Sequence, residues 1–178
     1  KLARDMLAGL LRAPLYAPQL GAVLPFALVQ ATRGRYEPLF ALNLALSGRV
    51  AENFAEVMHF AVVCAEDLPR IAAAARASAA ATRFGTGFIA LYERACAQVA
   101  VRAVPPEFYA SPSADVPVLL LSGGVDPATP PRHGEQVART LPRVLHLVAP
   151  YLGHGVTLHG CAPELIQRFV RQADAAGR

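Results

Sequence analysis

The chain has 178 residues, of which 54% are apolar and 17% charged, and its formal net charge is +4. A chain of this length is typical of one domain with a sizeable core. The composition excludes an intrinsically disordered protein. Lys1 is the only lysine, and the arginines are spread along the sequence. They form no basic stripe of the kind that binds nucleic acid, so we expect no nucleic-acid partner.

The first part of the chain, residues 1 to about 98, has the apolar spacing of helices. The predicted helical segments are 2–11, 20–28, 39–46, 67–82 and 88–95, with a helix or strand at 54–64. Asp67 is a candidate helix cap, and Pro69 falls in the first turn of the helix that follows. The sequence opens inside an amphipathic pattern, without Met and without a start signal, so we expect a fragment of a longer protein.

The longest uncharged stretch, residues 13–32, is long enough to cross a bilayer. It contains Pro14, Pro18 and Pro25, which would leave backbone carbonyls unpaired in lipid. We therefore expect buried helices or an apolar cap facing the substrate here, and no membrane span.

The second part of the chain has a different pattern. Prolines and serines at 99–115 predict a loop or a boundary, and we expect a mainly helical region at 1–110 followed by a second region at 111–178. A continuous apolar run at 116–121 predicts a strand buried on both faces. A helix from Pro131, a strand at 144–148 and a helix from Ala162 complete the pattern. This order predicts an α/β fold with a parallel crossover.

Two candidate functional residues follow these strands. Asp126 comes after the first strand, and His154 comes after the second, between Gly153 and Gly155. The carboxyl ends of neighbouring parallel strands lie on one edge of a sheet, so we expect the two side chains to meet. A carboxylate bonded to Nδ1 of an imidazole fixes its tautomer and leaves Nε2 free to act as a base. Taken singly, the Asp can be a turn residue and the His an idle surface residue.

These segments carry a resemblance to a known family. The run from Val116 to Pro131 is similar to the acid-bearing segment of α/β-hydrolases, and Gly153-His154-Gly155 is similar to their histidine loop. The segment from His59 to Asp67 resembles the cap of proline-iminopeptidase and tripeptidyl-aminopeptidase-like serine peptidases, and 160–163 also fits that group. The resemblance implies the C-terminal part of an α/β-hydrolase: a helical cap and the last parallel strands and helices.

The resemblance also implies a function. The protein would be a serine peptidase that releases short N-terminal units from peptides, with Asp126 and His154 in its catalytic triad and no metal or cofactor. The five serines, at 47, 78, 111, 113 and 122, are not in a G-x-S-x-G turn. Since the serine precedes the acid in this fold, we expect it upstream, in a missing N-terminal half, and we expect residues 1–178 alone to be inactive. By analogy with related cap acids, Glu66 and Asp67 are candidates to bind a substrate ammonium group; a surface acid and a helix cap are the alternatives.

The three cysteines form no CxxC pair, so a zinc site or thioredoxin-type chemistry has no support. They can be buried apolar residues. Given the resemblance, we expect a disulfide between Cys96 and Cys161, at a seam between cap and core, with Cys64 left for an upstream partner. A disulfide would imply a periplasmic or secreted protein; otherwise we expect a cytoplasmic one. An esterase or lipase on the same scaffold, acting on a small acyl substrate, and a non-catalytic truncated paralogue or binding module remain alternatives.

Overall fold

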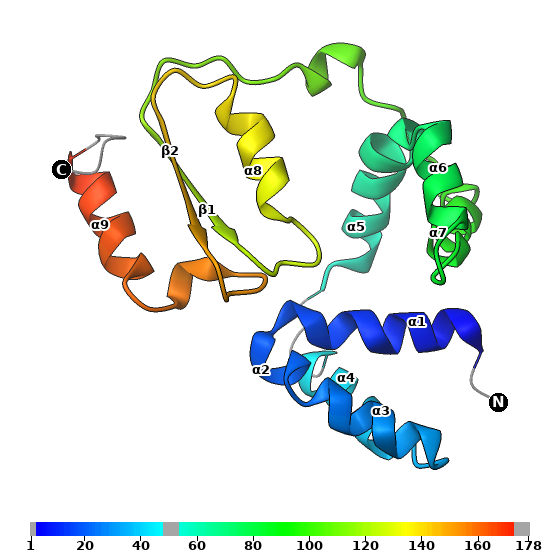
Figure 1. Ribbon diagram of the computed structural model, residues 1–178. Coiled ribbons are helices and arrows are strands. Elements are labelled where there is room, and N and C mark those ends of the chain that lie inside the picture. The colour runs from blue at the N-terminus through cyan, green and yellow to red at the C-terminus, as the bar shows by residue number, and fades with distance from the viewer. Residues whose placement is uncertain (1–2, 48–53, 173–178) are drawn as a thin grey trace. The chain divides into compact units, whose positions relative to one another are not determined.

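The computed structural model describes residues 3–47 and 54–172. The chain divides into two compact units, and Figure 1 labels the helices and strands of both. One comprises Lys1–Leu10 and Leu44–Ala110, and the other comprises Leu11–Asn43 and Ser111–Arg178. Our prediction divided the chain at 110/111 only. In the structure residues 11–43 belong to the same unit as the two strands. This segment packs against the loop that follows the second strand.

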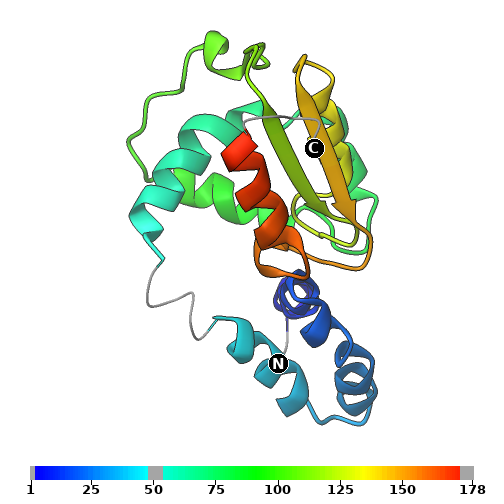
Figure 2. The same cartoon turned by 90° about the vertical axis from the view of Figure 1, so that its left-hand side faces the viewer.

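The second unit is built on two parallel strands, β1 (Val118–Gly123) and β2 (Val144–Ala149). The parallel pairing predicted from the strand–helix–strand–helix order is confirmed, and Val118 lies opposite Val144. Helix α8 (Pro131–Ala138) connects the strands and packs on both of them. Helix α9 (Ala162–Gln172) lies on the opposite face of the sheet, as the two views together show (Figure 2). A short 3-10 turn, Val156–Leu158, precedes α9.

Helix α8 comes very close to the sheet at Gly134. A Cβ atom there would lie 2.7 Å from Nε2 of His146 and 3.0 Å from Oγ of Ser122. These two side chains come from β2 and β1 and share a hydrogen bond of 2.8 Å beneath the helix. The hydrogen bond holds the imidazole in place, so a larger residue at 134 would have to displace it.

We expect Gly134→Ala to lower the free energy of unfolding by about 1–2 kcal/mol, because the clash outweighs the gain in helix propensity. Gly9→Ala is a matched control in helix α1 (Arg4–Arg12), since no atom lies within 4 Å of the Cβ position there. This control should be neutral or stabilising by up to about 1 kcal/mol. Denaturant unfolding of both variants measures the difference. An unchanged stability of Gly134→Ala would contradict the close packing of α8.

The remaining part of the second unit, residues 11–43, is helical. Pro14 and Leu39 are its fully buried large side chains, and Ala27 is also fully buried. Gly34, with φ of 77°, lies two residues after the helix Leu24–Thr32, in a conformation that favours glycine at helix ends. Its elements are the end of α1, a 3-10 turn at Ala13–Tyr16, α2 (Pro18–Gly21), α3 (Leu24–Thr32) and most of α4 (Glu37–Ser47).

The first unit is helical. The predicted helix at 67–82 is interrupted: a π-helix at Val63–Asp67 leads into a 3-10 turn at Leu68–Arg70. Pro69 lies in that turn, where its ring and missing N–H prevent a continuous α-helix. The elements of this unit are most of α1, α5 (Glu56–Val62), the π-helix, the 3-10 turn, α6 (Ala73–Ala80), α7 (Gly87–Cys96) and a 3-10 turn at Pro106–Tyr109.

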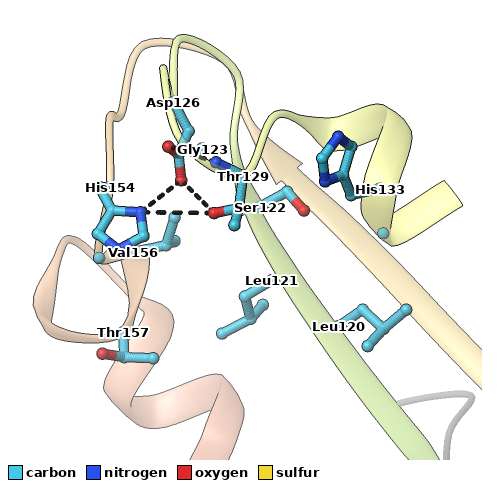
Figure 3. Close-up of a pocket in the computed structure, with 12 residues that line it drawn as sticks. Leu120, Leu121, Ser122, Gly123, Asp126, Thr129, His133, His154, Val156 and Thr157 are labelled. Atoms are coloured by element: carbon cyan, nitrogen blue, oxygen red, sulfur yellow. Dashed lines mark hydrogen bonds and ion pairs between the residues drawn. The ribbon is translucent and has the colours of Figure 1, made fainter. Parts of the chain in front are cut away.

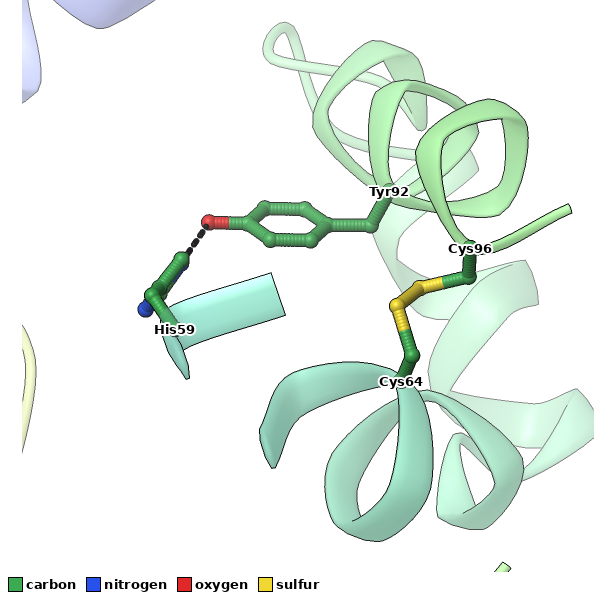
Figure 4. Close-up of a disulfide and its surroundings, with 4 residues drawn as sticks. All are labelled: His59, Cys64, Tyr92 and Cys96. Carbon is green, nitrogen blue, oxygen red and sulfur yellow. Dashed lines mark hydrogen bonds between the residues drawn. A yellow bond between two sulfur atoms is a disulfide. The ribbon is translucent and has the colours of Figure 1, made fainter. Parts of the chain in front are cut away.

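The disulfide of this unit corrects our prediction. Cys96 is bonded to Cys64, with their Cα atoms 5.3 Å apart (Figure 4). Cys161 is a free, exposed cysteine. The predicted bond between Cys96 and Cys161 is therefore wrong. Cys96 ends α7 and Cys64 lies in the π-helix that follows α5. Helices α5 and α7 pack together. A hydrogen bond of 2.9 Å between Nε2 of His59 and the Tyr92 hydroxyl joins the same pair of helices.

The uncharged stretch at residues 13–32 was predicted not to span a membrane. None of the helices in residues 3–47 and 54–172 is both long and apolar enough to span a bilayer. Pro14, Pro18 and Pro25 each lie in the first turn of a short helical element of this stretch.

Candidate active site

The loops that leave β1 and β2 touch each other through backbone atoms. Gly124 N–H donates to the Ala149 carbonyl at 2.8 Å, and Val125 N–H donates to the Leu152 carbonyl at 3.1 Å. A Cβ atom on Gly123 would lie only 2.1 Å from the Gly153 carbonyl oxygen. The absence of a side chain at Gly123 therefore lets the two loops approach, and this contact brings Asp126 and His154 to the same place.

Asp126 is 8% exposed, and its carboxylate accepts four hydrogen bonds. Oδ1 accepts the backbone N–H groups of Ala128 and Thr129, at 2.8 and 3.0 Å. Oδ2 accepts the Thr129 hydroxyl at 2.8 Å and faces Nδ1 of His154 at 2.9 Å. Burial alone would raise the pKa of Asp126, but the hydrogen bonds from Thr129, Ala128 and His154 outweigh it and lower the pKa to about 2. Asp126 is therefore a carboxylate at neutral pH.

The backbone of His154 is fixed by contacts with Tyr16, whereas its ring is partly exposed. Its N–H donates to the Tyr16 carbonyl at 3.0 Å, and Gly153 lies so close to Tyr16 that a Cβ would be 2.7 Å from the same oxygen. The next residue, Gly155, has φ of 92°, a conformation that favours glycine. The side chain of His154 is 48% exposed. Among the described residues, its Nε2 atom has no hydrogen-bond partner.

The hydrogen bond predicted between Asp126 and His154 is present, and it uses Nδ1 as expected (Figure 3). The two side chains border a pocket of about 320 Å³ at the end of β1. Thr129 completes a triangle with them, and Ser122 and His133 lie on the other side of β1 (Figure 3). Because the Asp126 carboxylate only accepts, Nδ1 of His154 carries the proton of this hydrogen bond, and Nε2 is the ring nitrogen left without a partner among the described residues.

The two predicted cap acids lie in the first unit. Glu66 and Asp67 are the last residues of the π-helix; Glu66 is half-buried and Asp67 is exposed. The Tyr109 hydroxyl donates to the Glu66 backbone carbonyl at 2.8 Å, and the Arg70 guanidinium lies over the Tyr109 ring. Within 3–47 and 54–172, neither carboxylate has a side-chain partner. No helix-capping hydrogen bond comes from the Asp67 side chain, so the expected cap is absent.

Two contacts of the site were not predicted from the sequence. Thr129 stands three residues after Asp126, a spacing at which an Asp side chain commonly binds backbone N–H groups in a turn. The contact between Thr129 and Asp126 could therefore have been predicted from that spacing. Tyr16, 138 positions before His154, supplies the carbonyl that holds the histidine loop, and its ring lies edge-on to the imidazole at 5.3 Å between centroids. No local pattern indicates a contact of that sequence separation.

The low pKa of Asp126 predicts a pH-dependent stability. The pKa falls from 3.8 to about 2 on folding, so the hydrogen-bonded carboxylate contributes about 2 kcal/mol above pH 4. That contribution is lost as the pH falls from about 4 to 2, because the unfolded chain binds the proton first. Denaturant unfolding of wild type and Asp126→Asn between pH 6 and pH 2 measures it. The difference between the two proteins should shrink by about 2 kcal/mol over that interval; a constant difference would contradict it.

Comparison with known families gives one match. A model described as TAP-like protein, an α/β-hydrolase family that includes tripeptidyl aminopeptidase-like proteins, matches residues 81–177. The matched region contains Asp126 and His154. No curated protein and no solved structure is similar enough to this chain to match it. The family match covers more than half of the chain and agrees with the two parallel strands and their helices, and this chain therefore belongs to the TAP-like family of α/β-hydrolases.

Proposed function

We propose that this chain carries the acid and the base of a serine aminopeptidase, which releases short units from the N-terminus of peptides. The observation that carries the proposal is the hydrogen bond of 2.9 Å between Oδ2 of Asp126 and Nδ1 of His154. A carboxylate at this position needs a proton on Nδ1, and in the neutral imidazole that the proposal requires, Nε2 then has a lone pair available. Membership of a family that includes tripeptidyl aminopeptidase-like proteins supports the choice of a peptide substrate.

In the proposed mechanism, Nε2 of His154 takes the proton of a serine hydroxyl as its oxygen attacks the carbonyl carbon of the scissile bond. The imidazolium that forms is stabilised by the Asp126 carboxylate. His154 then gives the proton to the leaving amine as the C–N bond breaks, and an acyl-enzyme remains. A water molecule next loses a proton to His154 and attacks the acyl carbon. The bond between the acyl carbon and the serine oxygen then breaks, His154 returns the proton to that oxygen, and the acyl group leaves as a carboxylic acid.

The serine of this mechanism is proposed to come from outside residues 1–178. Ser122 is the serine nearest to Asp126 in the sequence, but its hydroxyl is engaged with His146 beneath α8. The sequence contains no G-x-S-x-G turn. An upstream part of the same protein would then supply the nucleophile and the donors of the oxyanion hole.

The open edge of β1 supports such a partner. Among the described residues, β1 pairs with β2 alone. Val118 and Gly124 donate their N–H groups toward the β2 side, and alternate residues of a parallel strand face opposite neighbours. The N–H groups of Leu119, Leu121 and Gly123 therefore point to the other edge. Purely parallel sheets normally have both faces covered and more than two strands, so we infer that further strands of the same protein continue this sheet.

Glu66 and Asp67 are the proposed binding groups for the ammonium of the substrate's N-terminus. Glu66 is half-buried, with its carboxylate unpaired among the described side chains, and it lies in a π-helix, a distortion that is frequent at functional sites. Glu66→Gln should raise KM for an aminoacyl arylamide and leave KM for its N-acetylated analogue unchanged. Equal effects on both substrates would assign Glu66 to structure rather than to ammonium binding.

A periplasmic or secreted location is part of the proposal. The bond between Cys64 and Cys96 supports it, because disulfides form and persist in oxidising compartments and are rare in the cytosol.

The proposal is tested with the complete protein that contains this chain and, for comparison, with residues 1–178 alone. The complete protein should hydrolyse aminoacyl arylamides faster than short acyl esters, and an organophosphate should label a serine outside this chain. Residues 1–178 alone should show no turnover, since the base has no nucleophile to activate. Turnover by the short chain that disappears in His154→Ala would place the nucleophile within it. Preference for the ester would favour an esterase, and inactivity of the complete protein would favour a non-catalytic module.

A further inference from the structure

The Thr129 side chain contacts both members of the Asp–His pair. Its hydroxyl donates to Oδ2 of Asp126 at 2.8 Å, and the same oxygen lies 3.4 Å from Nδ1 of His154 (Figure 3). The backbone N–H of Thr129 binds the other carboxylate oxygen, Oδ1, at 3.0 Å. One residue therefore binds both oxygens of the carboxylate and borders the imidazole that the carboxylate faces.

The protons that Asp126, Thr129 and His154 carry determine which of these groups donates and which accepts. The carboxylate accepts and does not donate, and the Thr129 hydroxyl has a single proton, which it gives to Oδ2. The proton between Asp126 and His154 must therefore be carried by Nδ1. A lone pair of the Thr129 oxygen then faces that proton from the side, as a weak second acceptor. All three contacts are satisfied only when Nδ1 carries a proton, and in a neutral imidazole this is the Nδ1–H tautomer.

The hydroxyl also fixes where Oδ2 lies. The backbone N–H groups of Ala128 and Thr129 hold Oδ1 alone. Rotation about the Cβ–Cγ bond moves both oxygens together, so these two bonds oppose it at Oδ1, and a bond at Oδ2 opposes it further. The Thr129 hydroxyl provides that bond. We propose that Thr129 is a positioning residue, whose hydroxyl keeps Oδ2 of Asp126 against Nδ1 and thereby maintains the tautomer of His154 that can accept a proton at Nε2. This inference rests on the proposed function and extends it to a residue outside the triad.

The test is the tautomer of His154, measured by 15N NMR of the ring nitrogens in the 178-residue chain, where no turnover is needed. Thr129→Val keeps the branched shape and removes the hydroxyl, and Thr129→Ala is a second hydroxyl-free variant in case valine does not fit. Thr129→Ser keeps the hydroxyl. Thr140→Val is the matched control, because the Thr140 hydroxyl donates to the Val137 carbonyl at the end of α8, away from the site.

We expect the Nδ1–H tautomer to dominate in wild type, Thr129→Ser and Thr140→Val, and its share to fall in the valine and alanine variants. In the complete protein, the loss of the hydroxyl should lower kcat roughly tenfold to a hundredfold with KM unchanged, since small misplacements of catalytic groups have effects of that size. A wild-type tautomer in a folded valine or alanine variant would overturn the proposal. So would a serine variant that behaves like valine. A wild-type chain lacking the proton on Nδ1 would instead contradict the proposed function itself.

Discussion

Replacing Asp126 with Asn is expected to lower kcat of the complete protein by about four orders of magnitude, as the loss of the acid does in catalytic triads. The surroundings of Asp126 determine how the new amide would lie. The two backbone N–H groups at Oδ1 require an acceptor there, so the amide oxygen takes that place. The amide NH₂ then occupies the position of Oδ2 and points at Nδ1 of His154. Nδ1 must become the acceptor, its proton moves to Nε2, and the base is lost.

The measurement is kcat and KM for an aminoacyl arylamide at neutral pH. Asp115→Asn removes the same charge from an exposed position before β1 and is the matched control; its activity should equal that of the wild type. The 15N spectrum of the Asp126→Asn chain should also show the proton on Nε2. A variant that retains Nδ1–H and most of its activity would exclude Asp126 as the acid of the site.

The position of the Asp–His pair could be predicted because local signals determine it. Two short apolar runs predicted strands, and the helical pattern between them required a parallel crossover. The first strand was also predicted to be buried on both faces, but its residues are half-buried except Gly123. Loops that follow parallel strands meet at one edge of a sheet, so the order of elements alone placed Asp126 beside His154. The limits of the first strand differ from the prediction. Strand β1 begins and ends two residues later than predicted, so Ser122 and Gly123 belong to it. The glycine that allows the loops to touch is therefore the last residue of the strand.

The helical part was harder to predict, because tertiary contacts decide its organisation. Residues 11–43 have the same apolar spacing as the helices of the first unit, and nothing in that spacing indicates that Tyr16 and Pro18 pack against Gly153. The pairing of three cysteines is equally undetermined by their spacing. It depends on α5 and α7 lying together, with His59 and Tyr92 hydrogen-bonded between them.

Removing the disulfide is expected to lower the free energy of unfolding, and this is the second largest effect that we expect. The bond joins residues 32 positions apart, and closing a loop of that size lowers the entropy of the unfolded chain by an amount equivalent to about 3.5 kcal/mol. Cys64 is 7% exposed, so alanine is the better replacement, because a serine hydroxyl would be buried there. Cys64→Ala with Cys96→Ala should therefore unfold at a clearly lower denaturant concentration, with the transition of the first unit affected most.

Cys161→Ser is the control for this measurement, because Cys161 is exposed and carries no bond. Its stability should equal that of the wild type, and a reductant should destabilise both proteins to the level of the double variant. Labelling of the denatured, unreduced wild type should modify a single thiol per chain, at Cys161. Labelling at Cys64 instead would mean that Cys96 is bonded to Cys161, and a wild-type stability in the double variant would mean that the packing of α5 against α7 holds the first unit together without the bond.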